Sequence, residues 1–294
     1  MSKSTLYSPA SDSPLSVGNV LNNSDFMAGV IANGLTSSLA STLYGNAQDV
    51  ATGGAVLYQS ISAGDLYADD EINARAEGTE YQIVRLPDPD IKRDPVEDLG
   101  GAFEVTDEAW ERNVLDVAHN GLIQVSNSIR RKLDRRIAAT LAAAPIETIA
   151  ATDEWGGFTT TGSNPTPRGQ QPIGDMIRLD ESFQADEFGQ GLQTLLLNPI
   201  DATKVRLGYG EELPNVLAAV SRGENPVKIK ATTMIAAGTG YALSQSSPGA
   251  LGVEKPLTVE KIPVRDRRTT RVQAYIVCRP YISRLYAIRK IIGI

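Results

Sequence analysis

The sequence predicts an α+β fold organised around one long helix, and three observations lead to this prediction. Apolar residues recur every three or four positions between about residues 107 and 143, which is typical of a helix. Short segments rich in β-branched and aromatic residues lie on both sides of it and predict strands. The 294 residues are 41% hydrophobic and 21% charged, so the chain can bury a sizeable core in one large domain or two interleaved ones.

The overall charge and the cysteine count exclude several classes of protein. A formal net charge of −7 argues against a free duplex-DNA binder. A negative net charge still allows local basic patches on the surface. The single cysteine, Cys278, cannot form an internal disulfide, and its apolar surroundings predict a buried structural thiol in a reducing compartment. The Ser- and Pro-rich N-terminus lacks the apolar core of a signal peptide, and no apolar run approaches membrane-spanning length, so we expect a soluble protein.

The first ninety residues predict an arm followed by a hairpin. Residues 1–23 read as a flexible arm, and apolar positions between 26 and 39 suggest a short amphipathic helix that a Gly-rich stretch ends. Residues 56–61 and 81–86 then predict two strands that bracket a long polar loop. Such a two-stranded hairpin is marginal alone and needs another surface to lie on. Pro87, Pro89 and Pro95 predict irregular structure after it.

The long helix has the clearest start in the sequence. Thr106 is a good N-cap, and Val105 and Trp110 are spaced for a hydrophobic staple. The apolar stripe then runs without a charged interruption through Leu115, Ala118, Leu122, Val125, Ile129, Leu133, Ile137 and Leu141. A helix over residues 107–143 would be about 55 Å long. Gly121 inside it predicts either close packing or a bend.

The second half of the chain predicts a mixed α/β subdomain and a terminal sheet. Residues 151–172 read as a loop that separates two regions, followed by helices over 173–188 and 199–207. Strands are predicted at 193–197, 233–237 and 241–244, and the subdomain closes near Gly252. Strands at 257–264, 271–278 and 285–292 predict an antiparallel sheet against which the long helix packs.

Charge is distributed in two opposite blocks. Residues 65–98 contain eleven acidic and four basic residues, whereas residues 265–290 contain eight basic residues and one acidic residue. Two interpretations stay open: two solvated faces, or complementary surfaces that meet between neighbouring copies.

The sequence carries no pattern that predicts catalysis, a cofactor or a metal. The metalloprotease, nucleophile-elbow, P-loop, dinucleotide-binding and CxxC patterns are missing. The single histidine, His119, lies in the long helix beside the stripe without an accompanying nucleophile, which favours packing over a catalytic base. The run Asp69-Asp70-Glu71 could hold a divalent cation, but solvated loop carboxylates are the commoner explanation. We therefore predict a structural protein that is not an enzyme.

The order of these elements resembles the major capsid proteins of tailed double-stranded DNA bacteriophages, which have the HK97-type fold. The resemblance covers nearly the whole chain. Three segments carry most of it: FEVTDEAWERN at 103–113, LLLNPIDATKVRLG at 195–208, and the terminal run 257–294.

The resemblance implies a specific domain layout. Residues 1–53 would form an N-terminal arm, residues 54–91 the E-loop hairpin, and residues 172–252 an axial α/β domain. A peripheral domain would combine residues 92–171, which include a spine helix at 107–143, with a C-terminal sheet at 253–294.

The implied function is a major capsid protein that self-assembles into pentamers and hexamers of an icosahedral shell around the phage genome. The implied partners are further copies of the chain, a separate scaffolding protein, a portal, a cement protein and packaged DNA contacted without sequence specificity. The implied location is the virion, with assembly in the bacterial cytoplasm. Some members cross-link a hairpin lysine, but residues 54–91 contain no lysine, so we expect noncovalent stabilisation here.

The charge blocks then suggest contacts between subunits. In this hypothesis the acidic hairpin of one subunit meets either the basic turn at 265–271 or the spine-helix cluster at 130–136 of another, and reversing Arg267 and Arg268 to Glu blocks assembly of a folded subunit. The predicted contact residues are Asp65, Asp69, Asp70, Glu71, Glu77, Arg130, Arg131, Arg135, Arg265, Arg267, Arg268 and Arg271.

Two alternatives remain at this point. An encapsulin-like nanocompartment shares the implied fold but encloses a cargo enzyme, and the contents of the particle separate it from a capsid. A soluble enzyme of unknown type would have to hide its site in a loop such as residues 151–172.

Overall fold

The computed structural model describes most of the chain after the expected N-terminal arm. The described residues are 39–45, 48–68, 70–85, 90–112, 115–187, 190–221 and 225–294, and the side chains of residues 110 and 115–119 lie outside the description. Two compact units are formed: unit 1 has its described residues within 98–132 and 255–277, and unit 2 within 39–97, 133–254 and 278–294. The expected arm and amphipathic helix before residue 39 lie outside the described residues, which begin with α3 (Leu39–Leu43).

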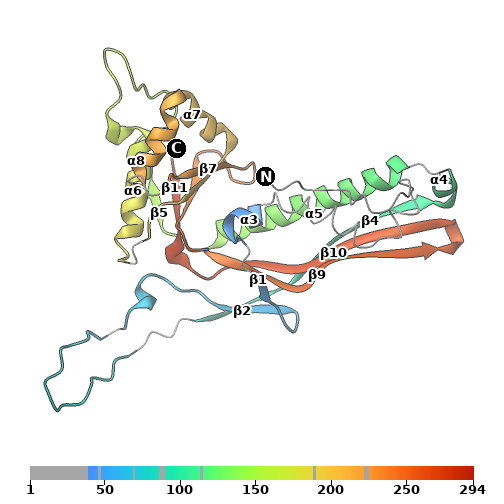
Figure 1. The fold of residues 1–294 in the computed structure, drawn as a ribbon, viewed down its shortest axis with the longest axis horizontal. Helices are drawn as coiled ribbons and strands as arrows, with labels where there is room; N and C mark the ends of the chain where they lie inside the picture. The colour runs from blue at the N-terminus through green and yellow to red at the C-terminus, as the bar shows by residue number, and fades with distance from the viewer. Residues whose placement is uncertain are drawn as a thin grey trace, which may run out of the picture. The chain divides into compact units, whose positions relative to one another are not determined.

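One four-stranded sheet contains three long strands, and their segments at 98–106, 255–264 and 269–277 belong to unit 1 (Figure 1). The three strands are β4 (Glu97–Thr106), β9 (Gly249–Val264) and β10 (Thr269–Ile282), and with β1 (Gln48–Val50) they follow the order β1-β9-β10-β4. A short 3₁₀ turn, η4 (Arg265–Arg267), joins β9 to β10. The predicted basic turn between two C-terminal strands is therefore confirmed.

The single helix predicted over residues 107–143 is two helices in the structure. α4 (Asp107–Glu111) is followed by a turn at Arg112, and α5 (Leu115–Ala143) is a separate 29-residue helix, about 43 Å long. The apolar stripe of α5 would have to continue toward the N-terminus through positions 108 and 111, and both are glutamates. The apolar face that holds α5 on its sheet therefore does not extend into α4.

The predicted start of the helical segment is correct. The Thr106 hydroxyl accepts a hydrogen bond from the Ala109 N–H at 3.2 Å, as an N-cap does. Of the predicted staple, Val105 is buried, and the side chain of Trp110 lies outside the description.

The apolar stripe of α5 is buried wherever its side chains are described. Leu122, Val125 and Ile129 are buried in unit 1, and Leu133, Ile137 and Leu141 are buried in unit 2. A Cβ at Gly121 would lie 2.6 Å from the ring of Phe103 on β4. The sequence predicted either close packing or a bend at Gly121, and the structure shows close packing.

The hairpin has a different second strand from the one predicted. β2 (Ala55–Gln59) pairs antiparallel with β3 (Ile91–Pro95), with Ala55 opposite Pro95. The predicted strand at 81–86 is wrong over its described residues, 81–85, which form no strand. The backbone N–H of Arg85 donates to the Asp70 carboxylate at 2.9 Å instead of to a neighbouring strand. The irregular structure predicted at Pro95 is also wrong, because Pro95 is the last residue of β3, where its missing N–H interrupts no ladder. Pro87 and Pro89 lie outside the described residues.

Unit 2 contains a five-stranded sheet. Its strands are β5 (Thr148–Ala150), β6 (Thr194–Leu197), β7 (Lys228–Ala231), β8 (Thr239–Leu243) and β11 (Ile288–Ile292), in the order β5-β11-β8-β6-β7. β11 is antiparallel to β8 and parallel to β5.

Two strand predictions in this region need correction. The segment 285–292 does not join the C-terminal antiparallel sheet, because the chain turns through η5 (Leu285–Ala287) and β11 enters the five-stranded sheet, where Ile288 and Ile291 are fully buried. No strand forms at 233–237. The Ile235 carbonyl accepts a hydrogen bond from the Asn198 side-chain amide instead of from a neighbouring strand. The strand lies earlier, at β7.

Three helices pack on this sheet, and two of them were predicted. α6 (Pro172–Gln184) and α7 (Pro199–Tyr209) correspond to the predicted helices, whereas α8 (Leu213–Val220) was not predicted. Residues 151–167 form the predicted loop, and η2 (Arg168–Gln170) leads into α6. Trp155 anchors this loop: it is fully buried, and its Nε1 donates to the Asp175 carboxylate at 2.7 Å. No helix in the described part of the chain is long and apolar enough to cross a membrane.

Candidate intersubunit surfaces

A network of charged side chains holds the base of the hairpin within unit 2. Arg279 on β10 donates to Asp94 and to Glu97, both at 3.2 Å, and Arg136 on α5 also donates to Glu97. The Tyr58 hydroxyl on β2 donates to Asp94 at 3.4 Å. Burial, followed by the charge of Asp94, raises the pKa of Tyr58. The start and end of the hairpin are thus tied to a helix and to a long strand of the same unit.

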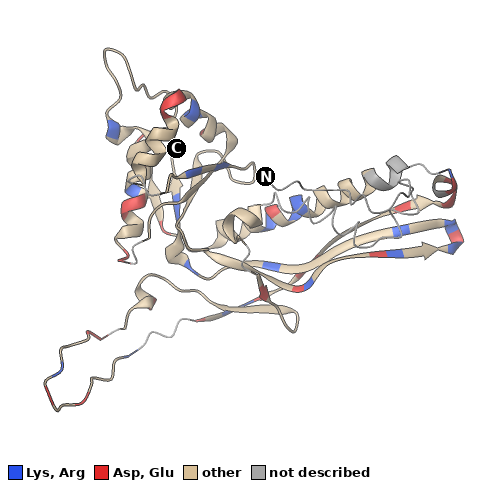
Figure 2. Cartoon of the chain, in the orientation of Figure 1, with Lys and Arg blue, Asp and Glu red and all other residues tan. Residues whose placement is uncertain are grey.

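The loop between β2 and β3 is polar, acidic and largely exposed (Figure 2). Asp65 lies in η1 (Gly64–Leu66), where the N–H and hydroxyl of Ser62 donate to its carboxylate and lower its pKa. Asp70 accepts from the Arg85 N–H, whereas Glu71 and Glu77 are exposed. Asp69 lies outside the described residues. Of the predicted acidic contacts, Glu71 and Glu77 are the ones most open to a partner.

The same loop exposes large apolar side chains that composition alone did not single out. Ile83 is 95% exposed, Ile72 81% and Tyr81 79%. The Arg75 guanidinium lies 4.5 Å from the centre of the Tyr81 ring and covers one of its faces. Isolated exposed apolar residues are ordinary, but several on one protruding loop indicate a contact surface.

The basic turn is partly neutralised within its own chain. Arg271 donates to Glu104, and Arg268 lies 3.9 Å from the Asp107 carboxylate and 3.6 Å from that of Glu108. The Arg268 carbonyl also accepts the Asp107 N–H. Arg265 and Arg267 are exposed in η4. The predicted basic contacts at the turn therefore divide into two with partners in the chain and two that face solvent.

The basic cluster of the long helix also divides by exposure. Arg131 and Arg135 are exposed on α5, and Arg130 is half-buried. Arg136, beside them, belongs to the hairpin-base network. Of the predicted contact residues in this cluster, Arg131 and Arg135 are thus the ones most open to a partner, and Lys132 is exposed beside them.

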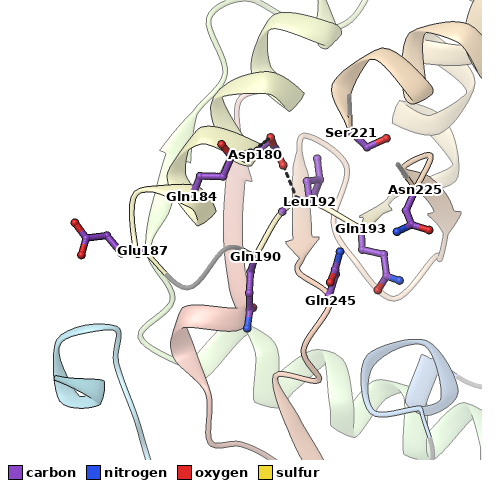
Figure 3. Close-up of a pocket in the computed structure, with 10 residues that line it drawn as sticks. Asp180, Gln184, Glu187, Gln190, Leu192, Gln193, Ser221, Asn225 and Gln245 are labelled. Atoms are coloured by element: carbon purple, nitrogen blue, oxygen red, sulfur yellow. Dashed lines mark hydrogen bonds between the residues drawn. The ribbon is translucent and has the colours of Figure 1, made fainter. Parts of the chain in front are cut away.

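A polar hollow lies beside α6, and its one acidic wall residue on that helix has a structural role (Figure 3). It measures about 480 Å³ and is lined mainly by amides and hydroxyls. Asp180 lies on its wall, but its carboxylate accepts the Leu192 N–H at 2.8 Å and the Gln184 side chain at 2.6 Å. This carboxylate therefore anchors the segment that leads into β6.

The described residues offer little reactive chemistry. They contain no group of three or more His, Cys, Asp or Glu arranged to hold a metal ion. Cys278 is buried as predicted, and burial followed by the charge of Glu97 raises the pKa of its thiol to about 12. His119 lies in α5, but its side chain is outside the description.

Sequence reasoning missed the internal acidic partners of the basic block. Glu97, Glu104 and Asp94 each bind an arginine more than 160 residues away in sequence. Arg289 likewise pairs with Glu147 and Asp186. In β4, Leu99, Phe103 and Val105 alternate with Asp98 and Glu104. This pattern was an available signal for Glu104, but not for Glu97 or Asp94.

The long sheet beside α5, the hairpin with its exposed loop and the α/β unit define a capsid subunit of the HK97 type. The chain belongs to the phage capsid protein family, whose model matches residues 95–291, and it is a major capsid protein. Membership also assigns the chain a structural role, as part of a multimeric shell in the virion.

Solved structures agree on the fold. The chain is similar to a virus-like particle from Pyrococcus furiosus, with a TM-score of 0.61, 13% identity, and coverage of 91% of this chain and 98% of that one. It is also similar to the capsid of cyanophage P-SCSP1u, with a TM-score of 0.58, 12% identity, and coverage of 87% and 88%. The capsid of Myoviridae phage XM1 gives a TM-score of 0.56, 14% identity, and coverage of 84% and 89%. No curated protein matches the sequence.

Proposed function

We propose that this chain assembles into the pentamers and hexamers of an icosahedral shell that encloses a double-stranded DNA genome. The observation that carries the proposal is the hairpin loop with Ile72, Tyr81 and Ile83 exposed. Burying the three side chains against a neighbour would stabilise the contact by about 1.5–3 kcal/mol for each fully buried side chain. A hairpin of two strands gains little stability alone, so a neighbouring subunit is the natural surface for it.

The proposed domain layout assigns a role to each part of the chain. Residues 1–53 form the N-terminal arm and residues 54–91 the E-loop hairpin. The peripheral domain combines residues 92–171 and 253–294, and residues 172–252 form the axial domain. The pairing of β11 with β8 supports one addition: the C-terminal strand completes the sheet of the axial domain.

Charge complementarity supplies the second part of the contact. The exposed acids Glu71 and Glu77 of one copy meet exposed bases of another, either Arg265 and Arg267 in η4 or Arg131 and Arg135 on α5. Arg268 and Arg271 are less suited to this role, because they already bind Glu104, Asp107 and Glu108 of their own chain. Reversing Arg268 would therefore disturb the subunit as well as the contact.

The remaining partners follow from the proposed role. A separate scaffolding protein guides assembly in the host cytoplasm, a portal admits the DNA, and a cement protein can reinforce the shell. The DNA is contacted through its phosphates without sequence specificity. Stability is noncovalent, because residues 54–91 contain no lysine for a cross-link. The role requires no catalysis.

The proposal is tested by the particles that the full-length chain forms. Size-exclusion chromatography and negative-stain microscopy should reveal closed icosahedral particles, and a stable monomer or dimer under every assembly condition would contradict the shell. Particles from the natural source should contain nuclease-protected DNA and a portal. A protein cargo in their place would favour the encapsulin-like alternative.

The hairpin contact needs its own variants. We expect Arg265→Glu with Arg267→Glu, or Arg131→Glu with Arg135→Glu, to prevent shell formation in a folded subunit, and the reversal of Glu71 and Glu77 to Lys to restore it. Lys255→Glu, at an exposed position of β9, is the matched control. Normal assembly of both arginine variants would overturn this contact while leaving the shell itself intact.

A further inference from the structure

The helix layer of the axial sheet has two unlike outer surfaces. α8 contacts both α6 and α7 and lies between them, and α7 contacts the edge strand β7 (Figure 1). The inner faces of α6 and α7 are buried in one core through residues such as Met176 and Val205. The outer faces of the two helices therefore lie on either side of α8.

The surface at α7 and β7 is an apolar groove with a basic rim. The groove measures about 660 Å³, and its walls include Ala202 of α7, Leu213 and Leu217 of α8, and Ile229 of β7. Beside it, α7 exposes Leu207 at 80% and Ile200 at 60%. Because an α-helix has 3.6 residues per turn, Ile200 and Leu207 lie on one side of α7. That side is next to the positions that line the groove.

The rim of this groove carries three bases. Arg206, Lys228 and Lys230 are exposed, and none of them has an acidic partner within the described part of the chain. By contrast, the neighbouring Lys204 is paired with the buried Asp201 at 2.9 Å. The three rim bases are thus available to an acidic group from outside.

The surface at α6 has the complementary character. Ile177 is 48% exposed, and Glu181 lies one turn further along the same face of the helix. Glu181 is exposed and forms no ion pair with a described residue. An exposed apolar side chain next to a carboxylate is complementary in chemistry to an apolar groove with a lysine rim.

We propose that α6 of one copy docks in the α7–β7 groove of the next copy, with Ile177 in the groove and Glu181 facing Lys228 and Lys230. The two surfaces belong to the same chain but differ from each other, so the contact is heterologous. Repeating a heterologous contact generates a ring where the rotation between copies closes, as the proposed pentamers and hexamers require. The inference rests on the proposed function, because it assigns the contact that closes pentamers and hexamers.

Charge reversal on each side tests the contact. We expect Glu181→Lys alone, and Lys228→Glu with Lys230→Glu alone, to lower the yield of particles by at least about tenfold, because like charges then face each other. All three substitutions in one chain should restore the yield. Glu154→Lys, at an exposed position of the loop before α6, is the control and should assemble normally.

Mixing the two reversed variants gives a sharper test of heterology. Each variant then offers a surface that fits only the other, so the copies must alternate around a ring. Alternation closes in a ring of six but not in a ring of five. We expect the mixture to form hexamers without closed shells, as seen by native mass spectrometry and negative-stain microscopy.

The outcomes separate this inference from the proposed function. Circular dichroism verifies that each variant is folded, and the two reversed sides are independent, so one misfolded variant leaves the other informative. Normal particle yield from either folded reversed variant overturns the α6 contact. Absence of particles from the unmodified chain would instead overturn the shell itself.

Discussion

The guanidinium of Arg271 donates two hydrogen bonds to the carboxylate of Glu104, at 2.8 Å from Nη2 and 3.1 Å from Nε. The bonds join β10 to β4 within unit 1. They are the main cause that lowers the pKa of Glu104 below its ordinary value of 4.5. Arg271 was expected to bind another subunit, but it binds Glu104 of its own chain.

This pair should make stability depend on pH. A carboxyl group with a lowered folded pKa contributes stability above its unfolded pKa, and that contribution is lost as the pH falls through the folded pKa. We expect Glu104→Gln to lower the free energy of unfolding at pH 7 and to match the unmodified protein once the pH is below both values. Urea unfolding of both proteins, measured from about pH 7 downward, follows this difference. A difference that does not shrink as the pH falls would contradict the prediction, and Glu77→Gln on the exposed loop is the control.

Gly121→Ala should destabilise the protein even though alanine favours helices by about 1 kcal/mol. The added Cβ would lie 2.6–2.9 Å from the ring of Phe103, and such overpacking costs about 1–3 kcal/mol. Chemical denaturation measures the effect. Asn127→Ala, at an exposed position of the same helix, should be neutral or stabilising. Adding Phe103→Leu should recover part of the loss, and strict additivity of the two changes would exclude the contact as the cause.

Arg279→Met should loosen the base of the hairpin. The substitution removes the guanidinium that lies 3.2 Å from the carboxylates of Asp94 and Glu97. Losing charged hydrogen bonds in a partly buried site costs about 1–3 kcal/mol. We also expect faster proteolysis within residues 60–90. Arg265→Met removes an exposed charge of the same type. Equal protease sensitivity of the two variants would mean that the network does not hold the hairpin.

Cys278 should be inert in the folded protein. With the thiol pKa raised to about 12, only about one molecule in ten thousand carries the reactive thiolate at pH 8, and the side chain is buried. A chromogenic disulfide reagent should react with it only after denaturation. Ala76→Cys, on the exposed hairpin loop, should react at once and serves as the positive control. Rapid labelling of Cys278 without denaturant would show that the β10 region opens readily.

The elements that the sequence predicted well are those with a local pattern. The stripe from Leu122 to Leu141 repeats at helical spacing, and each member is buried. The hairpin shows the limit of local pattern, because Ile83 and Val84 have high β-propensity but β3 formed at IKRDP, where two bases and a proline give little signal. Strand propensity depends on a partner strand, and the partner is chosen by the whole fold.

The sequence predicted the sign of the charge on each candidate surface, but not which of the charged residues are exposed. The acidic loop was found from composition, and most of its described residues are exposed. The partition of the arginines was not predictable, because Arg279 meets Glu97 across 182 positions. The α7–β7 groove was missed as well, since it needs α8 and the true position of β7.

The exposed apolar side chains of the hairpin also have a kinetic consequence for the unassembled protein. A newly folded copy presents Ile72, Tyr81 and Ile83 to solvent before any neighbour covers them. Productive assembly must then compete with nonspecific aggregation, which rises with concentration. Production of this chain in excess over what assembly can absorb should therefore yield insoluble material, and the concentration of free subunits then sets how much of the protein reaches the shell.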